Sequence, residues 1–533
     1  MDHKEQPASP SQKMPNILYI MADQMAAPIL PIYNKDSKIK MPHLSKLAEK
    51  GVVFENAYTN APLCAPSRFV MLTGQLTHRI RAYDNASELS SEIPTFAHYM
   101  RLLGYHTALS GKMHFIGADQ LHGYEQRLTS DIYPGDFGWS ANWDEHEVRL
   151  DWYHNMASVT DAGVCVRSNQ IDYDEEVMYR AKNYLYNHVR RRKDKPFFLT
   201  VSLTHPHDPY TTRQEWWDLY EDVEIPLPEH EPTQEELDPH SQRLQKVIDI
   251  WDKPMTDEQK RRARRAYFGN CSYVDDNIGK LIKVLEECNL TEDTIIVFSG
   301  DHGDMLGERS LWYKMNFFEM STRIPLVIYD PKQFEPRRVK ESVSSLDYLP
   351  TFIDLATKGN GHKYIDNELP LDGHSLYPLC LGEPGRDLVY GEYMGEGTRT
   401  TLFMVRTGKW KYISCAVDPP QLFNMEEDPL EKVNLAGKEE HATLIQGFQR
   451  EIETRCDLAR IHQDVLVSQR QRRLCWKTLT IGKMTHWDFQ AFFDTREEFV
   501  RNNGTILDDV EAVARFPPVI QPTGINTLTE KEN

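Results

Sequence analysis

Residues 16–21 read NILYIM, a nearly unbroken apolar run that ends just before Asp23. A run of this kind, without alternating polar residues, is typical of a strand buried on both faces of a sheet. Residues 197–203 and 294–299 form two similar runs, and residues 174–192 carry apolar side chains at helical spacing. Buried runs that alternate with amphipathic stretches predict an α/β fold, with a central, mostly parallel sheet flanked by helices.

Each buried run is followed by polar residues that can bind a metal ion. Asp23 follows the first run, His207 the second, and Asp301 and His302 the third. The carboxyl ends of parallel strands meet at one edge of a sheet, where open α/β sheets bind their ligands. The sequence therefore predicts one polar site at this edge.

The composition limits the class of protein. With 533 residues the chain is too long for one small core, and its net charge of -19 argues against a nucleic-acid or membrane partner. Eight cysteines without short paired spacings indicate neither a disulfide framework nor a zinc cluster. The start, from Met1 to Pro15, is polar, and no segment approaches the roughly 20 apolar residues of a membrane span. We predict a cytoplasmic protein that acts on a small molecule.

Residues 64–74 read CAPSRFVMLTG and predict the start of a helix. Pro66 suits a first helical turn, and Phe69 and Leu72 continue at helical spacing. Cys64 would then lie at a helix N-terminus, where backbone N–H groups and the helix dipole favour an anion. The alternative is that Cys64 is only a small buried apolar residue.

The run Cys64-Ala65-Pro66-Ser67-Arg68 resembles the C-x-P-S-R signature of the type I sulfatases, in the alkaline-phosphatase-like superfamily. The resemblance extends over nearly the whole chain. It implies that a maturation enzyme oxidises Cys64 to formylglycine, whose hydrate is the nucleophile toward a sulfate ester. Arg68 would orient this hydrate and balance charge.

The same resemblance implies a divalent metal ion. Its ligands would be Asp23, Gln24, Asp301, His302 and the residue formed from Cys64. Gln24 stands where the family usually has a second aspartate, and His302 where it often has asparagine. Mostly oxygen ligands favour Ca²⁺, while the imidazole and the reduced charge leave Mn²⁺ or Mg²⁺ open. The alternative for the two aspartates is helix capping.

Four cationic residues stand on family positions near the sulfate. Lys112 and His114 lie in a stretch that resembles the family's G-K-x-H, where the lysine holds sulfate and the histidine contacts the formylglycine. His207 and Lys314 are similar to residues near the leaving group. Either His207 or Lys314 would protonate the leaving alcohol, and the sequence leaves this choice open.

The C-terminal tail resembles the extension of the choline sulfatases, which implies choline-O-sulfate as the substrate. A quaternary ammonium group requires aromatic faces and a nearby carboxylate. An insert rich in aromatic residues, the region around Glu392 and Glu396, and the tail offer such side chains. The substrate-binding candidates are Trp139, His154, Asn155, Glu396 and Asp508, with Glu392 as an alternative to Glu396. Ordinary core packing is the alternative for each aromatic residue.

The domain organisation is predicted in three parts. Residues 1–382 would form the catalytic α/β domain, residues 383–462 a small C-terminal α+β subdomain with an antiparallel sheet, and residues 463–533 an extension. The extension is too short for a core of its own, so we expect it to pack on a neighbouring subunit of a homo-oligomer, as in the tetramers of the subgroup it resembles. Asp508 would then reach the partner's active site.

Two other functions remain open at this point. A phosphonate monoester or phosphodiester hydrolase, or another alkyl or aryl sulfatase of the superfamily, would share the cysteine and the metal ligands. A non-catalytic protein that binds anions or osmolytes would leave Cys64 unmodified.

Overall fold

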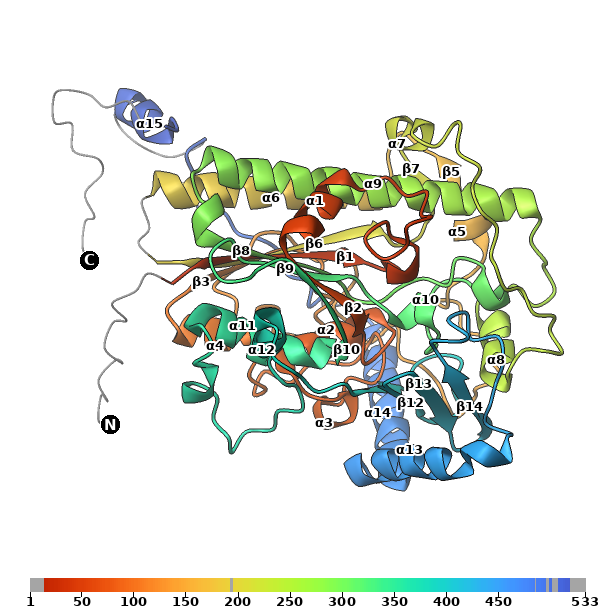
Figure 1. The fold of residues 1–533 in the computed structure, drawn as a ribbon. Helices are drawn as coiled ribbons and strands as arrows, with labels where there is room; N and C mark the ends of the chain where they lie inside the picture. Colours follow the sequence, from red (N-terminus) through yellow and green to blue (C-terminus); the bar gives the residue numbers. More distant parts are fainter. Residues whose placement is uncertain (1–13, 192–194, 485, 495–497, 501–506, 518–533) are drawn as a thin grey trace.

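The computed structural model describes residues 14–191, 195–484, 486–494, 498–500 and 507–517, without the side chains of 507–510. Its larger body is built on an eight-stranded sheet in the order β10-β2-β9-β8-β1-β6-β3-β4 (Figure 1). The strands are β1 (Asn16–Asp23), β2 (Val52–Tyr58), β3 (His106–Gly111), β4 (Gln126–Arg127), β6 (Phe197–Pro206), β8 (Thr294–Gly300), β9 (Leu326–Tyr329) and β10 (Arg337–Ser344).

The three runs predicted as buried strands are β1, β6 and β8, and they are neighbours at the centre of the sheet. Ile17 of β1 pairs with Phe198 of β6 on one side and with Ile295 of β8 on the other, both in parallel. Every residue of these three strands is buried. Only β9 runs antiparallel to its neighbours β2 and β8, so the predicted mostly parallel sheet is confirmed.

Helices cover both faces of this sheet, which explains why its central strands are apolar on both sides (Figure 1). Leu18 and Ile20 of β1 belong to the cluster that includes α6 (Asn169–Arg190) and α9 (Asp257–Glu287). Tyr19 of β1 belongs to the cluster on the opposite face. The helices on that opposite face are α2 (Cys64–Thr73), α4 (Phe96–Leu102), α11 (Tyr348–Thr357) and α12 (Tyr377–Leu381).

A second, smaller sheet follows in the chain, as predicted. It is antiparallel, in the order β11 (Val389–Tyr393), β12 (Leu402–Thr407), β13 (Trp410–Cys415) and β14 (Asp418–Asn424). Two helices come after it, α13 (Ala442–Arg455) and α14 (Leu458–Leu479). Ile461 and Val465 of α14 pack with Tyr83, Trp143 and Met394, so this part of the C-terminal region packs on its own chain.

The remaining helices and strands are short. They are α1 (Pro42–Lys50), α3 (Thr77–Ile80), α5 (Ala157–Thr160), α7 (Gln214–Asp218), α8 (Pro239–Val247), α10 (Glu319–Thr322), α15 (Leu507–Ala514), β5 (Gly163–Val164) and β7 (Thr211–Thr212). Among the helices of the described residues, none has the length and the apolar character that a membrane crossing requires. All eight cysteines are unpaired, as expected from their spacing.

Candidate active site

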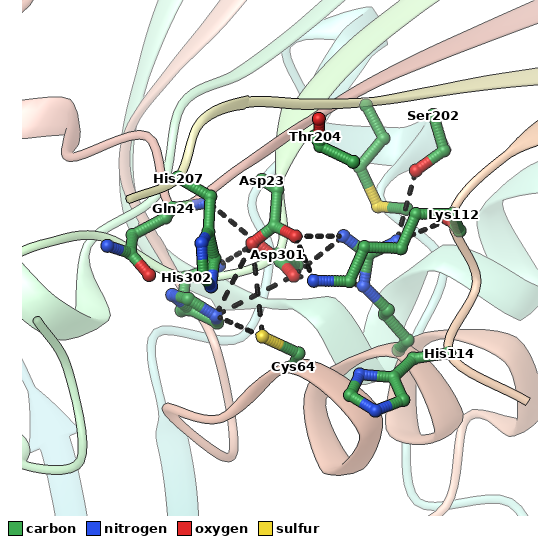
Figure 2. Close-up of polar contacts among 12 residues, drawn as sticks. Asp23, Gln24, Cys64, Lys112, His114, Ser202, Thr204, His207, Asp301 and His302 are labelled. Carbon is green, nitrogen blue, oxygen red and sulfur yellow. Dashed lines mark hydrogen bonds and ion pairs between the residues drawn. The ribbon is translucent and has the colours of Figure 1, made fainter. Parts of the chain in front are cut away.

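The polar residues predicted to meet at one edge of the sheet do meet there (Figure 2). They come from the ends of four strands and from the start of one helix. The contributors are Asp23 at the end of β1, Lys112 and His114 after β3, His207 after β6, Asp301 and His302 after β8, and Cys64 and Arg68 of α2. All of these side chains are buried.

Cys64 is the first residue of α2, as the position of Pro66 predicted. Its sulfur lies 3.2 Å from His302 Nε2 and 3.9 Å from Asp23 Oδ1, and the residue is 1% exposed. Burial opposes ionisation of the thiol, but Lys112 and Lys314, together with His302, outweigh it and hold the pKa of Cys64 well below its usual value. The site therefore stabilises negative charge at the helix start.

Four possible metal ligands lie together around this position. One ligand atom from each of Asp23, Cys64, Asp301 and His302 falls within 4.8 Å of the others. His302 Nε2 lies 3.7 Å from an oxygen of each aspartate. His302 Nδ1 lies 3.0 Å from the Gly303 carbonyl oxygen; donating to it leaves Nε2 free to bind a metal. Two carboxylates and an imidazole that converge in this way fit a divalent cation.

Gln24 lies beside this group and makes different contacts. Its backbone N–H donates to Asp301 Oδ1 at 3.0 Å, and it has a positive φ of 63°. Its side-chain oxygen accepts from Lys314 Nζ at 2.6 Å, and its side-chain nitrogen donates to Asp304 Oδ2 at 2.6 Å. The Gln24 side chain thus connects Asp304 to Lys314, while its backbone binds Asp301.

Arg68 is a fully buried cation between the two aspartates. Its Nη2 lies 2.8 Å from Asp301 Oδ2 and 3.3 Å from Asp23 Oδ2, and its Nη1 donates to the Lys112 carbonyl oxygen at 2.6 Å. Lys112 Nζ forms a further ion pair with Asp23 Oδ2. Buried charges persist only when they are paired, and here Arg68 pairs with both carboxylates and Lys112 with Asp23.

His207 and Lys314, the two candidates for the general acid, contact each other. Lys314 Nζ lies 3.0 Å from His207 Nε2. His207 Nδ1 lies 2.6 Å from the carbonyl oxygen of Asp208 and 3.2 Å from its carboxylate. An Nδ1–H that donates to Asp208 leaves Nε2 to accept from Lys314, so the two side chains form one hydrogen-bonded pair.

His114 is enclosed by aromatic side chains. Its ring centroid lies 5.3 Å from that of Tyr133 and 5.7 Å from that of Trp139, and these two rings are 5.0 Å apart. Lys112 Nζ lies 4.3 Å from the Tyr133 centroid. We call Tyr133 and Trp139 the aromatic wall. Neither ring nitrogen of His114 makes a close hydrogen bond within the described residues, and the ring interacts with Cys64, so it is available to a ligand bound at that position.

The acidic candidate Glu396 is buried and unpaired. It is 2% exposed, and within the described part of the chain neither carboxylate oxygen accepts a close hydrogen bond. The Tyr393 hydroxyl, which interacts with the carboxylate, donates to the Glu396 carbonyl oxygen at 2.8 Å. Burial, aided by the charge of Asp84 and opposed by Lys314, raises the pKa of Glu396 to about 7. Glu392, by contrast, accepts from the Thr77 hydroxyl at 2.6 Å and pairs with His78. Glu396 is therefore available to a ligand, whereas Glu392 is already bound to Thr77 and His78 and has a structural role.

The other substrate-binding candidates have different surroundings. The His154 ring is tilted against that of Tyr313, with 4.6 Å between the centroids, and its Nε2 lies 3.8 Å from Asp208 Oδ1. Burial and the nearby Lys314 lower the pKa of His154 to about 3, so it is neutral near pH 7. Asn155 is exposed, and its side chain accepts from the Ala157 N–H at 2.8 Å. The side chain of Asp508, in α15, lies outside the described residues.

Several residues of the site were not identified from the sequence. Asp208 follows His207 directly, and Asp304 follows the pair Asp301 and His302, so proximity in sequence was the available signal. Asp304 accepts from Gln24 and, at 2.6 Å, from the Tyr210 hydroxyl, which ties the end of β8 to the loop after β6. No sequence pattern marked Tyr133 as part of the site.

The fold and the site define a class of protein. A helix-covered sheet that gathers two carboxylates, an imidazole, buried ammonium groups and a cysteine at a helix start can bind an anionic ester and stabilise charge as that ester is cleaved. The chain belongs to the sulfatase family: the family model described as Sulfatase matches residues 15–358, and the protein is a sulfuric ester hydrolase. The resemblance found in the sequence is confirmed.

Individual relatives show which sulfatases the chain is most informatively compared with. The chain is 45% identical to the choline-sulfatase of Rhizobium meliloti (strain 1021) over 512 residues, which cover 94% of this chain and 98% of that protein. It is 30% identical to an arylsulfatase of Clostridium perfringens, covering 82% and 93% of the two chains. A second family model, described as choline sulfatase enzyme C terminal, matches residues 463–516, and a third, described as N-sulphoglucosamine sulphohydrolase, C-terminal, matches residues 307–457.

Solved structures share the fold. A phosphonate monoester hydrolase of Agrobacterium radiobacter aligns with a TM-score of 0.67 at 21% identity, over 83% of this chain and 95% of that one. At this level of identity the likeness concerns the architecture alone.

Proposed function

We propose that this sulfatase hydrolyses choline-O-sulfate to choline and sulfate. The observation that carries this proposal is the unpaired, buried carboxylate of Glu396, whose neighbour Gly395 accepts from the Trp143 indole N–H at 3.3 Å, in the loop that also carries Trp139. A buried carboxylate without a partner is costly unless a ligand compensates it. A trimethylammonium group supplies a positive charge, and Trp139 of the aromatic wall offers it a π face. The choline-sulfatase relative supports the same substrate.

The roles of the catalytic residues follow from their positions. The formylglycine proposed to form from Cys64 would supply the nucleophilic oxygen once a maturation enzyme has acted. Lys112, Lys314 and His207 surround this position and stabilise the negative charge that grows on the sulfuryl oxygens. His114, with both ring nitrogens free of hydrogen bonds to the described residues, accepts a proton there. The Lys314–His207 pair delivers the proton that the leaving choline requires.

The metal is proposed to be Ca²⁺, with Mn²⁺ or Mg²⁺ as alternatives, held by Asp23, Asp301, His302 and the residue formed from Cys64. Gln24 was predicted as a further ligand, and its amide oxygen accepts from Lys314 instead. When bound, it would supply positive charge beside the sulfate group. The two carboxylates and the approach of the ligand atoms to one another, which Figure 2 shows, support a divalent metal at this position.

The remaining proposals concern the setting of the enzyme. A homotetramer is proposed from the apolar side chains on the extension, since Phe492 is 87% exposed and Leu474 and Val500 also face solvent. A cytoplasmic location stays a prediction from the sequence.

Substrate preference tests the proposed function. We expect kcat/KM for choline sulfate to exceed that for its neutral carbon isostere, in which a tert-butyl group replaces trimethylammonium, by at least about tenfold, or roughly 1.4 kcal/mol of selective binding. Steady-state rates on both compounds, on an aryl sulfate and on a phosphodiester measure this. A higher kcat/KM for the phosphodiester would instead indicate the phosphonate monoester or phosphodiester hydrolase.

Replacing Glu396 by glutamine is expected to remove much of this preference. Glu396→Gln keeps the shape but loses the charge, so kcat/KM for choline sulfate falls about tenfold or more, while that for the neutral isostere changes less than about threefold. Because the pKa of Glu396 is raised to about 7, its charged form prevails above that pH. In the wild type the preference for choline sulfate over the isostere therefore grows as pH rises through 7, and in Glu396→Gln it stays flat.

The exposed Glu427→Gln serves as the control and is expected to behave as wild type. Equal losses on both substrates in Glu396→Gln would assign Glu396 a structural role instead.

A further inference from the structure

The loop of residues 135–144, which carries Trp139 of the aromatic wall, is held by the C-terminal region of the chain. We call it the Trp139 loop. Within it the backbone makes local turn contacts, such as the Ser140 N–H with the Phe137 carbonyl at 3.2 Å, and at its start the Gly135 carbonyl accepts from the Gly117 N–H at 2.8 Å. No helix or strand lies in it. Its conformation therefore depends on what packs against it.

Arg472 of α14 holds the centre of the Trp139 loop. Its guanidinium forms a buried, two-pronged ion pair with Asp84, with Nη2 2.9 Å from Asp84 Oδ2, and its Nη1 donates to Ser140 Oγ at 3.2 Å. The same Asp84 oxygen accepts from the Ala141 N–H at 3.1 Å. Arg472 and Asp84 thus fix both residues that follow Trp139 in the chain.

Gln469, one turn earlier on α14, holds the far end of the loop. Its Oε1 accepts from the Trp143 N–H at 2.8 Å, and Gln469 is 2% exposed. The Trp143 indole N–H in turn donates to the Gly395 carbonyl at 3.3 Å, next to Glu396 in the chain. Helix α14 therefore contacts the Trp139 loop directly and, through Trp143, the segment that carries Glu396.

The segment after α14 holds the near end of the loop. Asp488 Oδ1 accepts from the Gly135 N–H at 2.8 Å, and the Trp487 ring lies 5.1 Å from that of Phe137, edge to face. A Cβ added at Gly138 would lie 3.3 Å from the Trp476 ring, so the backbone here runs directly against the C-terminal region.

We propose that Arg472, Gln469 and Asp488 are positioning residues that set the place of Trp139 and so give the enzyme its selectivity for the cationic end of the substrate. This inference rests on the proposed function. Each of the three holds a backbone or side-chain group of the Trp139 loop, and Trp139 is the only aromatic ring of that loop that contacts His114 among the described residues. A cation–π contact weakens quickly when the ring moves away, so a displaced loop loses selectivity while the sulfate-binding residues, which lie on other strand ends, are retained.

The test uses Arg472→Met, which keeps the apolar stem and removes the fork. We expect KM for choline sulfate to rise about tenfold, with less than about threefold change for the neutral carbon isostere. Arg460→Met is the matched control on the same helix, since the Arg460 side chain is 80% exposed, and it is expected to behave as wild type. Asp488→Ala is a second variant that leaves the buried Asp84 pair intact, and it is expected to shift the preference in the same direction.

A double-mutant cycle shows whether the effect passes through Trp139. In a Trp139→Ala background, Arg472→Met and Asp488→Ala are expected to cause no further loss of preference for choline sulfate over the isostere. If the two substitutions lower the preference for choline sulfate as much in the Trp139→Ala background as in the wild type, the inference is overturned. If Arg472→Met fails to fold, Asp488→Ala decides alone, and an unchanged preference for choline sulfate in that variant also overturns the inference.

The same measurements distinguish an error in the proposed function from an error in the positioning role. If the wild type does not distinguish choline sulfate from its isostere, the substrate assignment is wrong. If the wild type does distinguish them and Trp139→Ala reduces the preference, but Asp488→Ala and a folded Arg472→Met do not, only the positioning role is wrong.

Discussion

Cys64→Ala is expected to abolish turnover of sulfate esters, with kcat lower by at least about 10⁴-fold, because the other hydroxyl in the first turn of α2, that of Ser67, is engaged with Thr59 and the Asp301 carbonyl oxygen. Substrate binding should persist, since Lys112, Lys314 and His207 remain in place. Hydrolysis is followed over many turnovers, and binding by calorimetry. The exposed Cys475→Ala is the control and is expected to retain full activity.

Cys64→Ser sharpens this prediction. A serine hydroxyl can attack once but has no second hydroxyl on the same carbon to expel sulfate, so at most one stable sulfate ester per chain is expected. Intact mass of the wild-type peptide around residue 64 is expected to show the loss of sulfur and two hydrogens and the gain of one oxygen. Multiple turnovers by Cys64→Ala, or an unmodified thiol in fully active enzyme, would contradict a formylglycine nucleophile.

Asp301→Asn is expected to lower bound metal and activity together, with kcat/KM reduced at least about 10²-fold. The substitution keeps the shape of the side chain but removes a charge that both faces the proposed metal position and pairs with Arg68 at 2.8 Å. Metal content by elemental mass spectrometry and rates on the same preparation test this. The exposed Asp222→Asn is the control.

Thermal unfolding separates loss of metal from loss of fold in Asp301→Asn, because the buried Arg68 loses its closer ion pair and keeps only the one with Asp23 at 3.3 Å, which also costs stability. Excess Ca²⁺ is expected to restore part of the activity if binding has weakened. A wild-type enzyme that stays fully active after complete removal of metal by a chelator would refute the metal's role.

Local patterns were sufficient for much of the fold and of the catalytic centre. The apolar run at residues 16–21 predicted β1 because a strand covered on both faces has to be apolar on both faces. Pro66 predicted the start of α2 at Cys64 because proline is tolerated in a first helical turn. Asp23 and Asp301 follow strands that proved to be neighbours of one another in a parallel sheet, β1 and β8, so their meeting followed from the class of fold.

Choices between similar residues needed the tertiary structure. Glu392 and Glu396 lie four residues apart and look alike in the sequence. Only the fold shows that Thr77 and His78 satisfy Glu392, while Glu396 is buried without a partner among the described residues. Whether a carboxylate is free depends on side chains hundreds of residues away, and their approach is decided by packing of the whole chain.

The C-terminal region shows the same division. Its sequence determined that the segment had too little apolar material for a core of its own and had to pack on another surface. The tertiary structure decided which surface α14 covers and placed Arg472 against Asp84, 388 residues earlier in the chain. A local pattern fixes the type of an element because the backbone and its nearest side chains determine it, whereas a buried ion pair between distant residues exists only when the assembled core excludes water around both charges.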